Sequence, residues 1–244
     1  MSKYVTMIGH DDAPHLNPPV ITVEEREALF ADMQEHERQA RETGRPALGA
    51  GAIYPIREDQ LFCDPFKIPD HWEYGYSIDP GWNVTAGLLG ARDPDLDKYY
   101  LVGEYYGKRD EPIIHAAGIK AMLPWKKLPG LIDPAGDNVG NMKDGTKMKE
   151  EYEDQGLVLE KANNAVHAGL RHCLVLMQNQ QLKVFNTLTY FKTEFRLYRR
   201  DEKGKIVKKN DHLMDDMRYL LNTDGAFSTR PIPRKRRGRR GGEW

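Results

Sequence analysis

A short strand that ends in an aspartate and is stopped by Pro-Gly constrains this chain most strongly. Residues 74–79, Tyr-Gly-Tyr-Ser-Ile-Asp, are rich in aromatic and β-branched side chains, and Pro80-Gly81 follows at once. The pattern predicts a buried strand that carries one carboxylate to its carboxyl end. Residues 84–90 and 98–106 predict two further strands. Because Asp-Pro-Gly is also a common turn, a turn explains Asp79 alone equally well.

The same theme returns once in the second half of the chain, and a helix there carries a further acidic position. Residues 131–133, Leu-Ile-Asp, predict another short apolar strand that ends in an aspartate and is followed by Pro134. A helix is predicted over 211–221, with His212 and Asp215 one turn apart and able to face one ion. Two structural explanations compete: Asp211 is suited to an N-cap, and the helix dipole favours acidic residues in a first turn.

Together the three aspartates suggest metal chemistry. Asp79, Asp133 and Asp215 come from two strand ends and one helix. Carboxylate oxygens are the ligands that Mg²⁺ and Mn²⁺ prefer. Two such ions ~4 Å apart can activate a water and stabilise the leaving 3′ oxygen of a phosphodiester. The spacing is therefore compatible with a two-metal phosphodiesterase.

The order of the remaining elements indicates the fold class. Three strands come first, and short strands then alternate with helices predicted over 113–122, 142–155, 165–178 and 189–200. This order predicts an α/β domain in three layers. Two cysteines outside any CxxC motif suggest no disulfide framework and a reducing compartment. No apolar run approaches the ~20 residues of a membrane helix, and the amino terminus lacks a signal-peptide core.

The net charge of −1 conceals an uneven distribution. Residues 1–73 carry 7 Lys/Arg against 14 Asp/Glu, residues 74–229 carry 22 against 22, and residues 230–244 carry 7 against 1. A basic tail adds sequence-independent affinity for phosphates, although it also serves simply to keep a chain soluble. The predicted DNA-binding residues of this tail are Arg234, Lys235, Arg236, Arg237, Arg239 and Arg240.

Residues 1–45 are predicted to be an appendage. A proline-rich start is followed by a charged helix over 24–42, which Thr22 and Glu25 begin with capping-box spacing. The predicted organisation is therefore a connector at 1–45, a globular domain at 46–228 and a disordered basic tail at 229–244. The sequence contains no GxxxxGK[ST] motif, so we expect no ATP binding by this chain.

The acidic motifs resemble the carboxyl-terminal nuclease domain of the large terminase subunit of tailed bacteriophages. The resemblance covers roughly residues 45–225, and Asp211-His212-Leu213-Met214-Asp215-Asp216-Met217-Arg218-Tyr219 is its most specific part. Further likeness lies in the segments 49–55, 68–72 and 195–199. The resemblance implies an RNase H-like fold: a central mixed five-stranded sheet, its first three strands antiparallel, with helices on both faces.

The resemblance also implies a function and its residues. The implied activity is a metal-dependent DNA endonuclease that cuts concatemeric viral genomes during packaging. Asp79, Asp133 and Asp215 would hold Mg²⁺ or Mn²⁺, and His212 would be an auxiliary ligand or proton shuttle. The implied partners are double-stranded DNA, the terminase ATPase domain, the small terminase subunit and the portal, with no membrane. The implied location is the host cytoplasm.

One departure from the family and two alternatives stay open at this point. Large terminases normally carry a packaging ATPase ahead of the nuclease. Either residues 1–244 are an excised or separately encoded nuclease part, or the motor is a different polypeptide. Residues 1–45 resemble the connector that leaves such an ATPase, which fits the first explanation. One alternative is another RNase H-like enzyme of the Holliday-junction resolvase or transposase type. The other is a non-catalytic packaging module that grips DNA through its basic tail.

Overall fold

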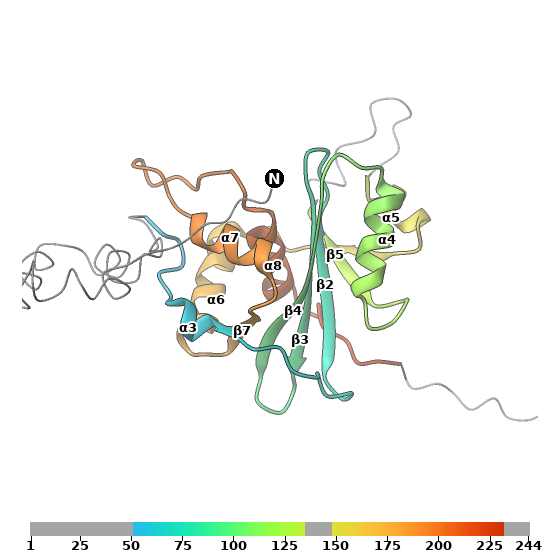
Figure 1. Cartoon of the computed structure of the whole chain (residues 1–244), viewed down its shortest axis with the longest axis horizontal. Helices are drawn as coiled ribbons and strands as arrows, with labels where there is room; N and C mark the ends of the chain where they lie inside the picture. Colours follow the sequence, from blue (N-terminus) through green and yellow to red (C-terminus); the bar gives the residue numbers. More distant parts are fainter. Residues whose placement is uncertain (1–50, 135–147, 232–244) are drawn as a thin grey trace, which may run out of the picture.

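A computed structural model describes residues 51–134 and 148–231. Seven strands of this part form a single mixed sheet in the order β1-β7-β4-β3-β2-β5-β6 (Figure 1). Their bounds are β1 (Phe62–Cys63), β2 (Glu73–Asp79), β3 (Thr85–Asp93), β4 (Lys98–Gly107), β5 (Pro129–Ile132), β6 (Val158–Lys161) and β7 (Leu182–Phe185).

The centre of the sheet is an antiparallel meander. β2 pairs with β3 and β3 with β4, as the family resemblance implied, and short turns connect them. The flanking strands run parallel: β5 pairs with β2, β6 with β5, β7 with β4 and β1 with β7. The prediction of five strands is wrong in number. The two-residue β1 is too short to show any periodicity and exists only because it pairs with β7.

Helices cover both sides of the sheet (Figure 1). We call the side covered by α6, α7 and α8 the α8 face, and the side covered by α4 and α5 the α4 face. The helices are α3 (Glu58–Leu61), α4 (Pro112–Met122), α5 (Met148–Asp154), α6 (Val166–Gln178), α7 (Thr189–Leu197) and α8 (His212–Asn222). The mixed α/β sheet with helices on both faces that the family resemblance implied is therefore confirmed.

Helix α8 lies directly on the central strands. A Cβ atom at Gly75 of β2 would lie 3.0 Å from Leu220, and one at Gly90 of β3 would lie 2.7 Å from the same side chain. These two glycines let the helix approach the sheet closely. The close packing positions the amino end of α8 beside the carboxyl end of β2.

Some predicted boundaries differ from the structure. Helix α7 ends at Leu197 instead of Arg200, because Arg199 and Arg200 leave the helix and pair with Ala52 and Ile206. The predicted connector 1–45, the first part of the predicted helix 142–155 and the tail residues from 232 onward lie outside the described residues. No helix of the described part is long and apolar enough to cross a membrane.

Candidate metal centre

Two of the predicted acids lie at the same end of neighbouring parallel strands. Asp79 is the last residue of β2, and Asp133 directly follows β5. The register pairs Ile78 with Ile132, and the Asp133 amide donates a hydrogen bond of 3.2 Å to the Ile78 carbonyl. Adjacent strands are ~4.8 Å apart. The sheet therefore brings the backbones of both acids together, although they are far apart in the sequence.

His212 contributes from the first turn of α8. Its Nδ1 lies 2.6 Å from Asp79 Oδ2, and both side chains are largely buried. The hydrogen bond to Asp79 raises the pKa of His212. Burial raises the pKa of Asp79, and the nearby charges of Asp133 and Asp215 raise it further, against the opposite effect of His212. The His212 imidazolium and the Asp79 carboxylate therefore favour each other's charged form, while burial opposes the charge on Asp79.

Asp215, the third predicted acid, is held by two cations. The Arg218 guanidinium donates to Asp215 Oδ1 over 2.9 Å, and the Lys208 ammonium donates to Oδ2 over 2.9 Å. Arg218 is 1% exposed and also donates to Asn164 over 3.0 Å. A Cβ atom on Gly169 would lie 2.6 Å from Arg218, so the glycine in α6 makes room for this side chain. Arg218 therefore fixes Asp215 from inside the protein.

Glu194 of α7, which the sequence reasoning did not single out, holds the amino end of α8. Glu194 Oε2 accepts the Leu213 amide over 2.7 Å, and Oε1 accepts the Tyr106 hydroxyl over 3.1 Å. Asp211 occupies the N-cap position, but its side chain makes no capping hydrogen bond. The N-cap explanation for Asp211 is therefore incomplete, because another acid caps the helix.

Asp216, the neighbour of Asp215, points into the protein. It is fully buried, and neither carboxylate oxygen has a hydrogen-bond partner among the described residues. Ser77 Oγ donates over 2.9 Å to the Asp216 backbone carbonyl, which links α8 to β2. Burial raises the pKa of Asp216 well above its usual range, and the charge of Asp79 raises it further. Asp216 therefore lies behind the candidate centre and faces away from solvent.

The four predicted site residues lie in one region of the structure, but their side chains do not form a coordination shell. In the described ranges, no three His, Cys, Asp or Glu side chains are close enough together to hold a metal as they stand. His212 contacts Asp79, while Arg218 and Lys208 contact Asp215. The residue types still suit a hard divalent cation, since three carboxylates and one imidazole lie in this neighbourhood. Burial, together with the charges of Asp133 and Asp215, raises the pKa of Asp79.

Comparison with known proteins identifies the family. The family model described as the terminase RNaseH-like domain matches residues 77–223, which include all four predicted site residues. The chain belongs to the terminase RNaseH-like domain family. The large terminase subunits of Enterobacteria phage LP7 and Salmonella phage P22 are each 35% identical to it over 206 residues, or 81% of the chain. The chain spans only 43% and 41% of their respective lengths.

Solved structures agree with this terminase assignment. The nuclease domain of the P22 large terminase matches with a TM-score of 0.63 at 32% identity, covering 71% of this chain and 92% of that one. The large terminase of a thermophilic bacteriophage matches with a TM-score of 0.61 at 21% identity, covering 84% of this chain and 54% of that one. The predicted family resemblance is confirmed.

The candidate centre also has neighbours that the sequence did not reveal. Lys208, Glu194 and Tyr106 surround the centre, yet each lies in a stretch that reads as an ordinary polar helix, loop or strand. Glu104 of β4 accepts the Tyr190 and Phe191 amides over 3.0 and 2.8 Å. It therefore caps α7.

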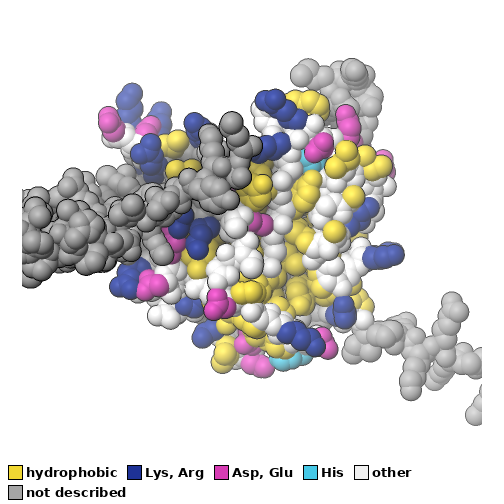
Figure 2. All heavy atoms as spheres, viewed as in Figure 1, with side chains coloured by type: hydrophobic (Ala, Val, Ile, Leu, Met, Phe, Trp, Pro, Cys, Tyr) yellow, Lys and Arg dark blue, Asp and Glu magenta, His cyan; other side chains and the backbone are white. Residues whose placement is uncertain are grey.

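Figure 2 shows Lys and Arg side chains scattered among Asp and Glu over the visible face, with no single basic patch. This agrees with the balanced charge of residues 74–229. The predicted DNA-binding residues Arg234, Lys235, Arg236, Arg237, Arg239 and Arg240 lie outside the described residues.

Proposed function

We propose that this chain is a divalent-metal-dependent DNA endonuclease that cuts concatemeric viral genomes during packaging. The observation that carries the proposal is the placement of Asp79 and Asp133 at one end of paired strands, with His212 in contact with Asp79, in a terminase RNaseH-like domain. Family membership favours this function over a resolvase, a transposase or a non-catalytic module.

Each residue has a role in the proposal. Asp79, Asp133 and Asp215 hold the metal, and the buried Arg218 positions Asp215. His212 is placed to accept or return a proton beside Asp79. When two Mg²⁺ or Mn²⁺ ions are bound, they supply an activated water and stabilise the leaving 3′ oxygen. The large terminase nuclease of thermophilic phage G20c, which matches with a TM-score of 0.50 at 15% identity, was crystallised with bound cobalt. This supports use of a divalent ion.

The rim of the centre suits a nucleic acid. Tyr106 and Tyr190 stack with centroids 4.4 Å apart, and the Lys108 ammonium lies 5.8 Å from the Tyr106 ring centroid. Trp82, three residues beyond Asp79, is 67% exposed, and its carbonyl accepts the Arg109 amide over 3.2 Å. Aromatic faces beside basic groups are typical of surfaces that contact bases and phosphates.

The packaging role places this domain in a larger assembly. We propose that it acts with a terminase ATPase domain, the small terminase subunit and the portal, in the host cytoplasm. The thermophilic-phage large terminase with the TM-score of 0.61, about half of which this chain matches, was also crystallised with ADP. This supports a separate nucleotide-binding part in proteins of this kind, and we propose no ATPase activity for the chain itself.

Cleavage of supercoiled plasmid tests the proposal. We expect nicking and linearisation with Mn²⁺ or Mg²⁺, none with EDTA, and loss of cleavage in Asp79→Ala and Asp133→Asn. Asp224→Ala, an exposed acid beyond α8, is the matched control and should cleave like the native chain. Circular dichroism checks that each variant is folded. Undiminished cleavage by folded Asp79→Ala would reject the assignment.

A further inference from the structure

Lys208 lies on the open side of the acidic centre. Its ammonium is 2.9 Å from Asp215 Oδ2 and 3.1 Å from Asp211 Oδ2. The two aspartate side chains are only 13% and 10% exposed, whereas the lysine side chain is 60% exposed. The lysine therefore reaches the acids from solvent, along the side from which an ion would also arrive.

Oδ2 is the Asp215 oxygen that does not contact Arg218, and Lys208 donates a hydrogen bond to it. Oδ1 is held from inside by the buried Arg218, so Oδ2 is the oxygen that faces Lys208. An ammonium and a divalent cation at one carboxylate oxygen repel each other. A divalent ion at Asp215 Oδ2 is therefore destabilised as long as the Lys208 ammonium stays 2.9 Å from that oxygen, and moving the ammonium away favours the ion.

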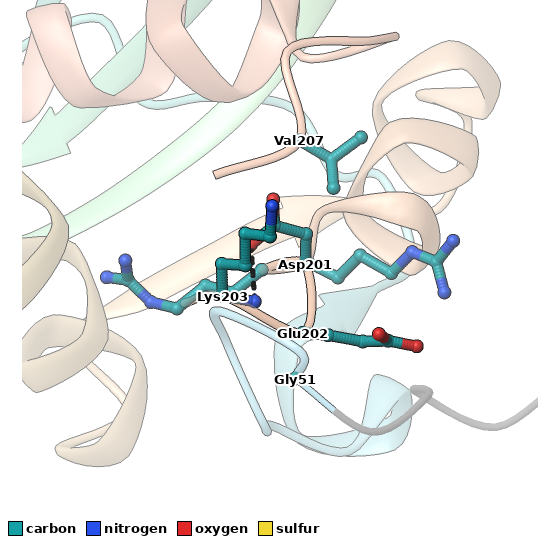
Figure 3. A pocket seen from close by; sticks show the side chains of 7 residues that line it. Gly51, Asp201, Glu202, Lys203 and Val207 are labelled. Carbon is teal, nitrogen blue, oxygen red and sulfur yellow. Dashed lines mark hydrogen bonds between the residues drawn. The ribbon is translucent and has the colours of Figure 1, made fainter. Parts of the chain in front are cut away.

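The backbone that carries Lys208 is anchored, so displacement requires only the side chain to move. The preceding segment turns back on itself: the Val207 amide donates to the Arg199 carbonyl over 3.0 Å, and Arg200 pairs with Ile206. The Arg200 amide also donates to the Gly51 carbonyl over 2.8 Å. Figure 3 shows residues of this turn around a surface hollow that Gly51 and Val207 also line. The four-carbon stem of lysine is flexible enough to swing into solvent.

We propose that Lys208 is a displaceable internal cation that competes with a divalent metal ion for Asp215. Without metal, its ammonium neutralises Asp211 and Asp215 and holds them together. With metal, it leaves Asp215 Oδ2, so that part of the gain from binding the ion is lost in breaking the ion pair. The inference rests on the proposed metal site, and it makes Lys208 a positioning residue that weakens metal affinity while stabilising the metal-free protein.

Titration of the full chain with MnCl₂ by isothermal calorimetry tests this competition. Lys208→Met removes the charge and keeps most of the apolar stem. We expect it to bind Mn²⁺ about five-fold or more tightly than the native chain, because a competing cation is gone. Lys208→Arg keeps a cation and should not gain affinity. Lys209→Met is the matched control for loss of one exposed lysine from the same turn, and its affinity should change by less than about two-fold.

Thermal unfolding gives a second readout that does not depend on cleavage. In EDTA, Lys208→Met should melt below the native chain and Lys209→Met, because Asp211 loses its ion pair with Lys208 and Asp215 keeps only Arg218. In saturating Mn²⁺, the difference should disappear. Unchanged or weaker Mn²⁺ binding by Lys208→Met would overturn the inference while leaving the proposed nuclease intact. Absence of Mn²⁺ binding in every variant, with no plasmid cleavage, would overturn both.

Discussion

Both faces of the sheet are packed by apolar clusters, but they differ in the charged residues that they bury. The α8 face buries charged residues: Glu194, Asp211, Asp216 and Arg218. The α4 face is packed by an apolar cluster that includes Tyr76, Ile78, Leu89, Ile119 and Leu159. Burying a charge costs stability unless it is paired and hydrogen-bonded. The α8 face therefore gives up stability to hold the centre in place, while the α4 face supports the sheet from behind.

The largest expected effect comes from removing the buried cation of the α8 face. Arg218→Met leaves Asp215 without its internal partner, and breaking a buried ion pair from one side costs about 3–5 kcal/mol. Urea unfolding measures the loss. Arg196→Met is the matched control: Arg196 pairs with Glu58 over 2.8 Å, but both side chains are 28% exposed, so we expect about 1 kcal/mol or less. Equal losses in the two variants would contradict the contrast between buried and half-exposed pairs.

A cavity in the α4 face should lower the free energy of unfolding nearly as much but leave the cleavage rate unchanged. Ile119 of α4 is fully buried, and Ile119→Ala should lower the free energy of unfolding by about 2–5 kcal/mol. We expect plasmid cleavage per folded molecule to stay within about two-fold of the native rate, because the acids belong to the other face. A much larger loss of cleavage in folded protein would show that the two faces are coupled.

Replacing the buried carboxyl group of Asp216 by an uncharged amide should stabilise the protein at neutral pH. Asp216 has a raised pKa in the folded protein against 3.8 in the unfolded chain, so native stability falls as the pH rises from about 4 through the folded pKa. Asp216→Asn does not titrate, and its advantage should grow to about 1 kcal/mol at pH 8 and shrink toward pH 4. Urea unfolding across this range is the measurement. A gain that does not depend on pH would contradict a buried, titrating carboxyl group.

The smallest expected effect concerns protons that compete with metal. Below its raised pKa, His212 is an imidazolium paired with Asp79; above that pKa it is neutral, and Asp79 becomes available. Mn²⁺ affinity should therefore rise about three- to ten-fold from pH 6 to pH 8, because binding releases protons. His212→Gln should flatten this rise, and calorimetry at several pH values measures it. The same slope in the variant would exclude His212 as the competing group.

The sequence predicted best those features that depend on local chemistry. The strand before Asp79 shows aromatic and β-branched residues that Pro80-Gly81 terminates, and β2 ends there. Asp133 has the same signal, which identified both acids without any tertiary information. Helix α6 was equally visible from its apolar spacing. Each of these patterns is complete within about a dozen residues.

The missing features depend on contacts between distant segments. Arg218 looks like a solvent-exposed helix residue, and only the packing of α8 against α6 at Gly169 buries it. Glu194 caps a helix that begins 18 residues later, and Glu104 caps one that begins 85 residues later. Lys208 is a common residue in a polar turn, and the fold alone brings it to Asp215. No local pattern distinguishes such residues from ordinary surface charges.

The parallel pairing of β2 with β5 sets the distance between two of the candidate metal ligands. Asp79 and Asp133 follow residues in register, so the separation of their backbones is the spacing between strands, ~4.8 Å. That length is close to the ~4 Å between two catalytic ions. A bulge inserted in either strand would change this backbone separation, even with both aspartates retained. The distance between the two acids therefore depends on this rung of backbone hydrogen bonds and not on the loops around the centre.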